Sequence, residues 1–555
     1  MRLPRALLLP FLVALCSCAG TDRVTGRRDS GGPVSPEQAA YDVLHYGLDL
    51  LVLPESRAIW GTLTIRARVL EPLSSLVLDL DRELVVEGAD ERGRALGFVH
   101  RDGRLMIDLQ TVRAAGETLT VRVSYGGQPR EAPRPPWEGG FTWARTADGE
   151  PWIATSNQGE GADLWWPCKD HPSDEPDSMD IRVTVPRPLV CATNGRLVGV
   201  EDAGPTARTY HWQVSTPINN YVVALNIAPY RTVVREYEST SGDVFPVTYW
   251  VLPENYEKGV ELMEQIVAHL RFFEERFGPY PFRADKYGVV ETPHLGMEHQ
   301  TIIAYGNRYR NNKWGFDFLH HHELSHEWWA NMVTAPDWKD FWVHEGIGTY
   351  AQNLYVEELH GMAAYHESMA DNRGRILNRR AVAPREPRSS GQMYFVDPDA
   401  PEGERVGDND IYYKASWALH TLRYLIGDEA LFTTLRRLAY PEPSLERVTD
   451  GRQCHFVTTD DFIEQAETWS GRELGWFFEV YFRQPALPRL VSERADSRLV
   501  LRWELPRDLP FPMPVEVCID GEATRVPMPG GRAEISLPED ATVVLDPGGW
   551  ILKEE

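Results

Sequence analysis

The fold of the central part of this chain is decided by the stretch His322-Glu323-Leu324-Ser325-His326, which Glu345 follows nineteen residues later. Two histidines four positions apart project from one face of a helix, about 5–6 Å apart, and can therefore bind one metal ion. A glutamate between them is the residue type with which a zinc hydrolase deprotonates a metal-bound water molecule. Glu345 completes a set of two histidines and one glutamate that leaves a fourth coordination position open, which is typical of catalytic zinc. We therefore predict one Zn²⁺ per chain, with His322, His326 and Glu345 as ligands and Glu323 as the general base.

A simpler explanation of this stretch is a chance His-Glu-x-x-His sequence on a charged helix face. Glu345 opens a second helical pattern, residues 345–359, and this argues against chance because ligand type, spacing and helical setting all agree. His320 and His321 lengthen the run of histidines, but neither has a histidine four residues on with a glutamate between. We expect these two residues to have a supporting or structural role.

The length and composition describe a folded protein of several domains. A chain of 555 residues is too long for one hydrophobic core, which predicts about three domains. Its 82 acidic residues outnumber its 57 basic ones, giving a net charge of −25. Nucleic-acid binding requires basic patches, so we expect no nucleic-acid partner.

The N-terminus has the pattern of a targeting segment. Arg2 and Arg5 precede an apolar run, residues 6–15, that is too short to span a bilayer and is typical of a signal peptide. The following Leu15-Cys16-Ser17-Cys18 resembles the cleavage box of bacterial lipoproteins, with Cys18 as the lipidated residue. We predict a signal peptide over 1–17, a flexible tether over 18–38, and a lipid anchor on the periplasmic face of the outer membrane. Cys16 is unusual in such a box, so cleavage and secretion is the alternative; both place the protein in the bacterial cell envelope or outside it.

Four cysteines remain beyond this segment, and they are too sparse for a disulfide framework. They are Cys168, Cys191, Cys454 and Cys518. Four cysteines allow three pairings, between which the sequence does not choose. We expect most of them to be buried thiols.

The pattern of apolar residues divides the chain into three folded parts. Strand-like alternation, as in residues 63–69 and 119–123, predicts an N-terminal β-saddle or β-sandwich over 39–232. Helical spacing then dominates 233–484, with one short apolar strand at 287–290 and a long loop around 385–405. Strand signals return at 499–503, 515–519, 533–537 and 542–545, which predicts a small C-terminal β-sandwich over 485–555. The predicted fold class is therefore multidomain α+β.

Two runs around the metal-binding residues resemble a known family. The run from His322 to Asn331 and the run from Phe341 to Gly346 are similar to the metal-binding helices of zinc aminopeptidases of the aminopeptidase N and leukotriene hydrolase family. This resemblance implies a thermolysin-like catalytic domain, a mixed sheet with helices, over 233–484. His344 stands where the family usually has asparagine, next to a ligand without being one.

The resemblance also implies a site for the amino group of the substrate. Gly296-Met297-Glu298-His299-Gln300 resembles the family's exopeptidase loop, in which the glutamate holds the free α-amino group. A carboxylate near the metal would pair with an ammonium group and fix which peptide bond reaches the metal. Glu298, Gly296 and Met297 are thus predicted to bind substrate, although alone Glu298 would pass for a surface glutamate.

Two further residues are assigned by the same resemblance. The segment from Ile411 to Trp417 is similar to the family's Tyr-x-Lys-Gly motif, which implies that the Tyr412 hydroxyl stabilises the oxyanion. Adjacent Tyr413 is the alternative, and Ala415 replaces the usual glycine. Gln158 precedes a block, residues 165–172, that resembles the family's N-terminal signature, in which a glutamine helps to bind the α-amine.

The predicted function is zinc-dependent removal of the N-terminal residue from peptides with a free N-terminus. The alternatives that keep the zinc are an endopeptidase or an epoxide hydrolase on the same fold. A non-catalytic envelope binding protein is a further alternative, but it would be expected to lack a ligand or Glu323. Residue preference and oligomeric state do not follow from the sequence.

Overall fold

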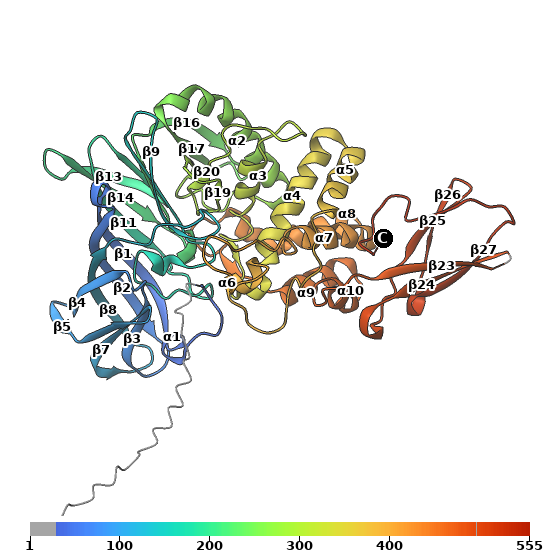
Figure 1. The fold of residues 1–555 in the computed structure, drawn as a ribbon, viewed down its shortest axis with the longest axis horizontal. Coiled ribbons are helices and arrows are strands. Elements are labelled where there is room, and N and C mark those ends of the chain that lie inside the picture. The colour runs from blue at the N-terminus through green and yellow to red at the C-terminus, as the bar shows by residue number, and fades with distance from the viewer. Residues whose placement is uncertain (1–28, 496, 555) are drawn as a thin grey trace, which may run out of the picture.

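The computed structural model describes residues 29–495 and 497–554 of the 555-residue chain. Cys18, the predicted signal peptide and most of the predicted tether lie outside the described residues. Figure 1 shows an N-terminal β-rich part beside a mixed central part, with a small β-rich part at the far end. This arrangement confirms the multidomain α+β fold class. Among the residues described, no helix has the length and apolar character needed to cross a membrane.

The N-terminal part is built on an eight-stranded sheet in the order β13-β14-β11-β1-β2-β8-β4-β5. The predicted alternation is present in β2, whose inward side chains from Leu63 to Val69 are buried while Arg66 and Arg68 face solvent. The strands of this sheet are β1 (Tyr41–Leu53), β2 (Ala58–Val69), β4 (Leu84–Glu91), β5 (Arg94–Leu96), β8 (Thr118–Gly127), β11 (Met179–Pro186), β13 (Arg196–Asp202) and β14 (Ala207–Val214). Two smaller sheets complete this part: β3 (Leu73–Asp79), β7 (Arg104–Arg113) and β6 (Phe98–Arg101); and β12 (Val190–Thr193), β15 (Leu225–Ala228), β10 (Pro151–Ser156) and β9 (Gly140–Arg145).

The central part is a five-stranded mixed sheet covered by helices. Its order is β16-β17-β18-β20-β19, with parallel pairs at β17–β18 and β18–β20. The strands are β16 (Arg231–Glu238), β17 (Val244–Val251), β18 (Tyr287–Glu291), β19 (Gly296–Met297) and β20 (Ile303–Tyr305). The helices are α2 (Tyr256–Phe277), α3 (Phe318–Ser325), α4 (Trp342–His360), α5 (Met362–Arg373), α6 (Ser390–Tyr394), α7 (Tyr413–Ile426), α8 (Asp428–Ala439), α9 (Thr459–Ser470) and α10 (Gly475–Tyr481), with a short β21 (Val333–Thr334) and β22 (His455–Phe456) pair between them. The predicted domain boundary between residues 232 and 233 falls inside β16. All of β16 belongs to the central part, because it pairs with β17.

The C-terminal part contains two three-stranded sheets. They are β23 (Arg489–Ala495), β24 (Arg498–Glu504) and β27 (Arg532–Ser536), and β26 (Glu522–Val526), β25 (Val515–Ile519) and β28 (Val543–Leu545). β23 and β26 were not predicted, because most of their side chains face solvent and show no apolar alternation. Leu501 and Trp503 of this part share one continuous hydrophobic core with the helices of the central part.

Residues 29–33, which we name the N-terminal strap, join two distant segments. The Ser30 amide donates to the Gly159 carbonyl (3.1 Å), and the Ser30 carbonyl accepts from the Ser390 amide (2.9 Å). The Asp29 carboxylate accepts from the Ser389 hydroxyl and from the Gly391 amide (2.7 Å). The structure therefore differs from the predicted tether over residues 29–38, since these hydrogen bonds and the short helix α1 (Pro36–Ala39) hold that stretch on the body. It also places α6 inside the segment predicted as a loop, where Ser389 and Gln392 form a capping box.

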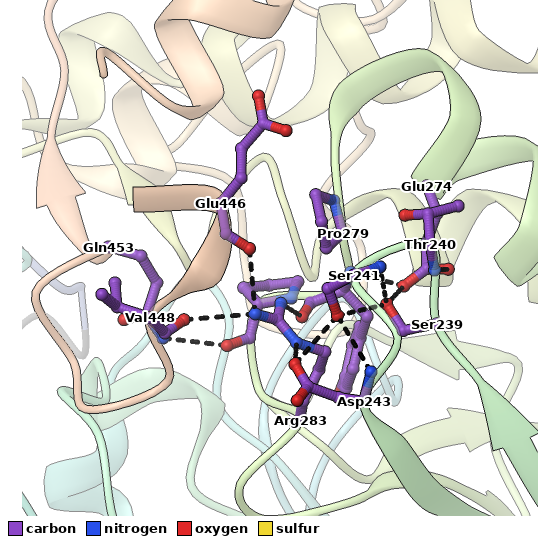
Figure 2. Close-up of polar contacts among 12 residues, drawn as sticks. Ser239, Thr240, Ser241, Asp243, Glu274, Pro279, Arg283, Glu446, Val448 and Gln453 are labelled. Atoms are coloured by element: carbon purple, nitrogen blue, oxygen red, sulfur yellow. Dashed lines mark hydrogen bonds and ion pairs between the residues drawn. The ribbon is translucent and has the colours of Figure 1, made fainter. Parts of the chain in front are cut away.

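A buried polar network fixes α2 against its surroundings (Figure 2). The Glu274 carboxylate, near the end of α2, accepts from the Tyr237 hydroxyl and the Tyr280 amide, both at 2.8 Å. The Arg283 guanidinium donates to Asp243 at 2.7 Å and to the Glu446 carbonyl at 3.0 Å. A buried charge is costly unless it is paired and hydrogen-bonded, and these contacts satisfy the buried Glu274 carboxylate and the buried Arg283 guanidinium. Through Glu274 they also join the end of α2 to β16 and to the segment that follows the helix.

Cys168, Cys191, Cys454 and Cys518 are free thiols in the structure. Cys168 and Cys191 are buried, as expected, whereas Cys454 and Cys518 are half-buried.

Candidate metal centre and substrate cleft

The three predicted metal ligands converge on one point. His322 Nε2 lies 3.3 Å from His326 Nε2, and Glu345 Oε2 lies 3.3 Å from the first and 3.5 Å from the second. Ligand atoms held about 2.0–2.1 Å from a tetrahedral zinc ion are roughly 3.3–3.4 Å from one another. The triangle of ligand atoms thus has the dimensions of one face of a zinc tetrahedron.

The state of Glu345 supports a cation at this point. Glu345 Oε2 is buried and accepts no hydrogen bond, although it is the oxygen that faces both imidazoles. Burial raises the pKa of Glu345, but the His326 and His322 imidazoles and the Tyr412 hydroxyl outweigh this effect and lower it to about 2. A buried carboxylate with an unpaired oxygen requires a positive partner. The residues present therefore fit a zinc ion.

Close packing of α3 on α4 brings the ligands together. Asp317 caps the N-terminus of α3 by accepting from the His320 amide at 3.1 Å. A methyl group on Gly348, three residues after Glu345, would lie 2.5 Å from the Ser325 hydroxyl oxygen, so a larger residue here would require this hydroxyl or one of the two helices to move. His344 faces away from the metal point and accepts from the Ala335 amide at 2.8 Å.

Glu323 lies beside the metal point, against the edge of β19. A methyl group on Gly296 would lie only 2.6 Å from Glu323 Oε1 and 2.6 Å from Leu319 Cδ1. Burial raises the pKa of Glu323 well above its usual range, and the nearby carboxylates of Glu298 and Glu345 raise it further. Gly296 therefore shapes the space in which the predicted general base sits.

Glu298 and Gln158 form the predicted amine site from two different domains. Gln158 Nε2 donates to Glu298 Oε1 at 2.6 Å and to Glu345 Oε1 at 3.3 Å. Burial, followed by repulsion from Glu345, raises the pKa of Glu298 to about 8. The amine site thus adjoins the metal ligands directly.

The loop that carries Glu298 is held by residues that the sequence analysis missed. Asn331 Nδ2 donates to the Glu298 carbonyl at 3.1 Å, and Glu327 Oε1 accepts from the Thr301 amide at 2.7 Å. From the N-terminal part, Asn194 Nδ2 donates to the Gln300 carbonyl at 2.7 Å. Glu327 and Asn331 belong to the run from His322 to Asn331 that resembles the family's metal-binding helix, and this resemblance was the available signal for their role.

The structure distinguishes the two candidate tyrosines. The Tyr412 hydroxyl donates to Glu345 Oε1 at 2.9 Å, and its ring lies 6.1 Å from that of His322. The Tyr413 hydroxyl instead accepts from Arg375 at 2.6 Å. Tyr412 is therefore the tyrosine at the metal point.

The remaining histidines of the sequence motifs do not reach the metal point. His320 contacts His269 and the Tyr287 hydroxyl, each at 2.8 Å. His321 is buried among aromatic rings, including Tyr355 at 4.7 Å. Burial and the neighbouring His294 lower the pKa of His299, which is also buried. These residues fill the interior behind the site.

The metal point opens into a cleft of about 540 Å³. Its lining includes Pro136, Trp137 and Gln158 of the N-terminal part, together with Met297, Glu298 and Tyr394 of the central part. It also includes Thr349, Gln352, Asn353 and Val356 of α4, Asn372 of α5 and Arg375 just beyond α5. Trp137 and Tyr394 were not predicted from the sequence, because both lie in segments without a periodic apolar pattern.

Comparisons with known proteins agree over most of the chain. The peptidase M1 N-terminal domain matches residues 42–222, and the peptidase family M1 domain matches residues 261–481. Leucine aminopeptidase 2 of Vanderwaltozyma polyspora is 26% identical over 240 residues, which are 40% of this chain and 33% of that protein. Leukotriene A-4 hydrolase of Xenopus laevis is 26% identical over 356 residues, which are 60% of this chain and 54% of that protein.

Similarity to solved structures extends further along the chain. The M1 zinc metallopeptidase from Deinococcus radiodurans has a TM-score of 0.65 and 26% identity, and the match covers 83% of this chain and 97% of that one. In contrast, this chain spans about a third of the length of the first curated relatives that it matches.

Proposed function

Because the chain belongs to peptidase family M1, we propose that it is a zinc-dependent aminopeptidase that removes the N-terminal residue of peptides. The observation that carries this proposal is the buried carboxylate of Glu298 beside Gln158, directly next to the metal ligands. The α-ammonium group of a peptide substrate would supply a positive partner for this carboxylate. A peptide that continued beyond this point in the N-terminal direction would place an uncharged amide there, so the cleft selects substrates with a free N-terminus.

The side chains of this site divide the reaction between them. A bound zinc ion would supply polarisation of the scissile carbonyl group and would lower the pKa of a water molecule to about 7. Glu323 accepts a proton from the attacking water and returns it to the leaving amine. Tyr412 donates its hydroxyl proton to the carbonyl oxygen as negative charge develops there. Glu298 and Gln158 hold the α-amine and so fix which peptide bond is cut.

The experiment compares blocked and unblocked substrates. The wild-type protein is assayed on a panel of aminoacyl arylamides, with chelator and with zinc added back, and on one peptide with a free or an acetylated N-terminus. We expect zinc-dependent cleavage of the free peptide only. Equal cleavage of both peptides would favour an endopeptidase and contradict the proposal.

Two variants separate the roles of the carboxylates. Glu323→Gln should keep bound zinc and lose nearly all turnover, because it removes only the proton acceptor. Glu298→Gln should raise KM for free peptides by about tenfold or more, since a charge-assisted contact to the ammonium is lost. Near-normal turnover by Glu323→Gln would reject this mechanism.

We propose that the protein is attached to the bacterial cell envelope through a lipid on Cys18, on the periplasmic face of the outer membrane. The support for this location is the sequence 15–18 and the preceding apolar run. Metabolic labelling with a radioactive fatty acid, in wild type and in Cys18→Ser, tests it. Label absent from both proteins, with the protein in the medium, would indicate secretion instead.

A further inference from the structure

The cleft is lined by both acidic and basic side chains. Glu298, Glu323 and Glu345 gather around the metal point. The basic residues of the lining are Lys313 and Arg375, and Asp371, a further acidic residue of the lining, lies beside Lys313. An extended ligand in this cleft would therefore meet the acidic cluster at the metal point and the positive charge of Arg375.

Arg375 differs from Lys313 in having no acidic partner in the described part of the chain. Lys313 Nζ lies 3.0 Å from Glu367 Oε1 and 2.6 Å from Asp371 Oδ2, which neutralise it. Among the described residues, no carboxylate oxygen lies within 4.0 Å of the Arg375 guanidinium. In a chain with 82 acidic and 57 basic residues, Arg375 is thus an unneutralised cation in the substrate cleft.

Tyr413 holds the guanidinium in place. Arg375 Nη1 donates to the Tyr413 hydroxyl at 2.6 Å, and the guanidinium carbon lies 5.1 Å from the centre of the Tyr413 ring. This contact uses one of the five N–H donors of an arginine. The remaining donors have the fork geometry that binds a carboxylate through two parallel hydrogen bonds.

The position of Arg375 is within reach of a short peptide. Tyr413 follows Tyr412, which contacts Glu345, and Asn372 at the end of α5 donates to Asn353 of α4 at 3.2 Å. Arg375 is therefore adjacent in the chain or in space to residues that contact Glu345 and Asn353, two positions of α4 separated by roughly 12 Å along the helix axis. Two to four extended residues span about this distance.

We propose that Arg375 binds a carboxylate of the substrate on the leaving-group side of the scissile bond. The C-terminal carboxylate of a di- to tetrapeptide is the ligand that fits this distance, so the cleft favours short peptides with a free C-terminus. An acidic side chain in the second or third residue has the same chemistry and is the other possible source. This inference rests on the proposed aminopeptidase function and names the substrate class of the same cleft.

The test compares substrates that differ only in the carboxylate. The full-length protein is assayed on an aminoacyl arylamide and on a tripeptide X-Gly-Gly with the same first residue, as the free acid and as the C-terminal amide. The tripeptide amide X-Gly-Asp-NH₂ offers a side-chain carboxylate in its place. The variants are Arg375→Gln and, as the matched control, Arg379→Gln, whose side chain is exposed and outside the cleft lining.

We expect the wild type to prefer the free acid over the amide by about tenfold in kcat/KM, mainly through a lower KM for the acid. This ratio is that of one charged hydrogen-bonded contact near the surface. Arg375→Gln should reduce this ratio to near one, and Arg379→Gln should keep it. A preference for X-Gly-Asp-NH₂ that disappears in Arg375→Gln would support the carboxylate site with a side chain as its ligand.

Two results would overturn the proposal. One is a wild type that does not distinguish the acid and Asp-containing peptides from X-Gly-Gly-NH₂. The other is an equal loss on all four substrates in Arg375→Gln, matched by Tyr413→Phe, which would show that the arginine only positions Tyr413. Failure of the proposed function looks different, because the wild type would then not hydrolyse the arylamide at all.

Discussion

Replacing Gly296 by alanine tests whether the backbone of β19 sets the position of the general base. The added methyl group would lie 2.6 Å from Glu323 Oε1, whereas such contacts are essentially never shorter than 3.0 Å and are ordinary from 3.4 Å. The Glu323 carboxylate must therefore move by about 0.4–0.8 Å, and the Leu319 side chain must move with it. The three atoms nearest to this methyl group belong to Glu323 and Leu319 and not to a metal ligand, so we expect zinc to remain bound.

The expected cost follows from the size of this displacement. A misplacement of about 1 Å in a catalytic group can reduce the rate by about a hundredfold. We expect Gly296→Ala to reduce kcat on an aminoacyl arylamide by about 10- to 100-fold, equivalent to about 1.4–2.7 kcal/mol in the activation free energy. The measurements are steady-state kinetics, zinc content and melting temperature.

Gly475→Ala is the matched control, because Gly475 opens α10 at the surface with no atom within 4 Å of the added methyl group. It should retain wild-type kinetics. If Gly296→Ala folds, binds zinc and retains wild-type kcat, then Glu323 does not act from the position described, and the assignment of Gly296 to its support is refuted.

Two further predictions concern stability. A chelator should lower the melting temperature and added zinc should restore it, because an ion bound by ligands of both α3 and α4 would bind only the folded state. A Glu345→Gln variant should respond less. A wild-type melting temperature that the chelator does not change would contradict a metal at this site. Burial lowers the pKa of Lys286 from 10.5 to about 7. Below pH 7 the amine is charged in both the folded and the unfolded protein, so the full cost of burying the charge reduces the stability of the fold. This cost disappears as the pH rises toward 10.5, where the unfolded protein also loses the proton. Between pH 7 and pH 9 the wild type should therefore gain about 1–2 kcal/mol of stability relative to Lys286→Met. Denaturant unfolding at both pH values measures this, with the exposed Lys258→Met as control; a difference that does not change with pH would contradict it.

The metal ligands were predictable because they obey local rules. His322 and His326 are fixed by the geometry of a single helix, and Glu345 lies in the first turn of a helix with a clear pattern. The amine site was predictable only through resemblance, because Gln158 and Glu298 come from different domains and no periodicity relates them. Tyr394 was missed because α6 is one short turn whose stability depends on the Ser389 cap and on the N-terminal strap rather than on an apolar pattern.

The same limit applies to the edges of the fold. β23 and β26 have mostly exposed side chains, so their strand conformation depends on backbone pairing with β24 and β25. Residues 29–38 have a composition typical of linkers, yet they are held by partners more than a hundred residues away in the chain. Such contacts leave no trace in the local sequence.

If Cys18 carries a lipid, the N-terminal strap would also limit the distance between the membrane and the folded protein. Because Asp29 is bound to the body, only the ten residues 19–28 would separate the membrane from the folded protein. Ten residues reach at most about 36 Å, so the folded protein would stay within about this distance of the membrane surface. Peptide substrates would have to diffuse to the membrane to reach it. A force on this segment would act first on Asp29, which is bound to Ser389 and Gly391, and then on Ser30, which is hydrogen-bonded to Gly159, the neighbour of Gln158. Tension at the membrane anchor would therefore be transmitted to α6, which carries Tyr394, and to the segment that carries Gln158, both of which line the substrate cleft.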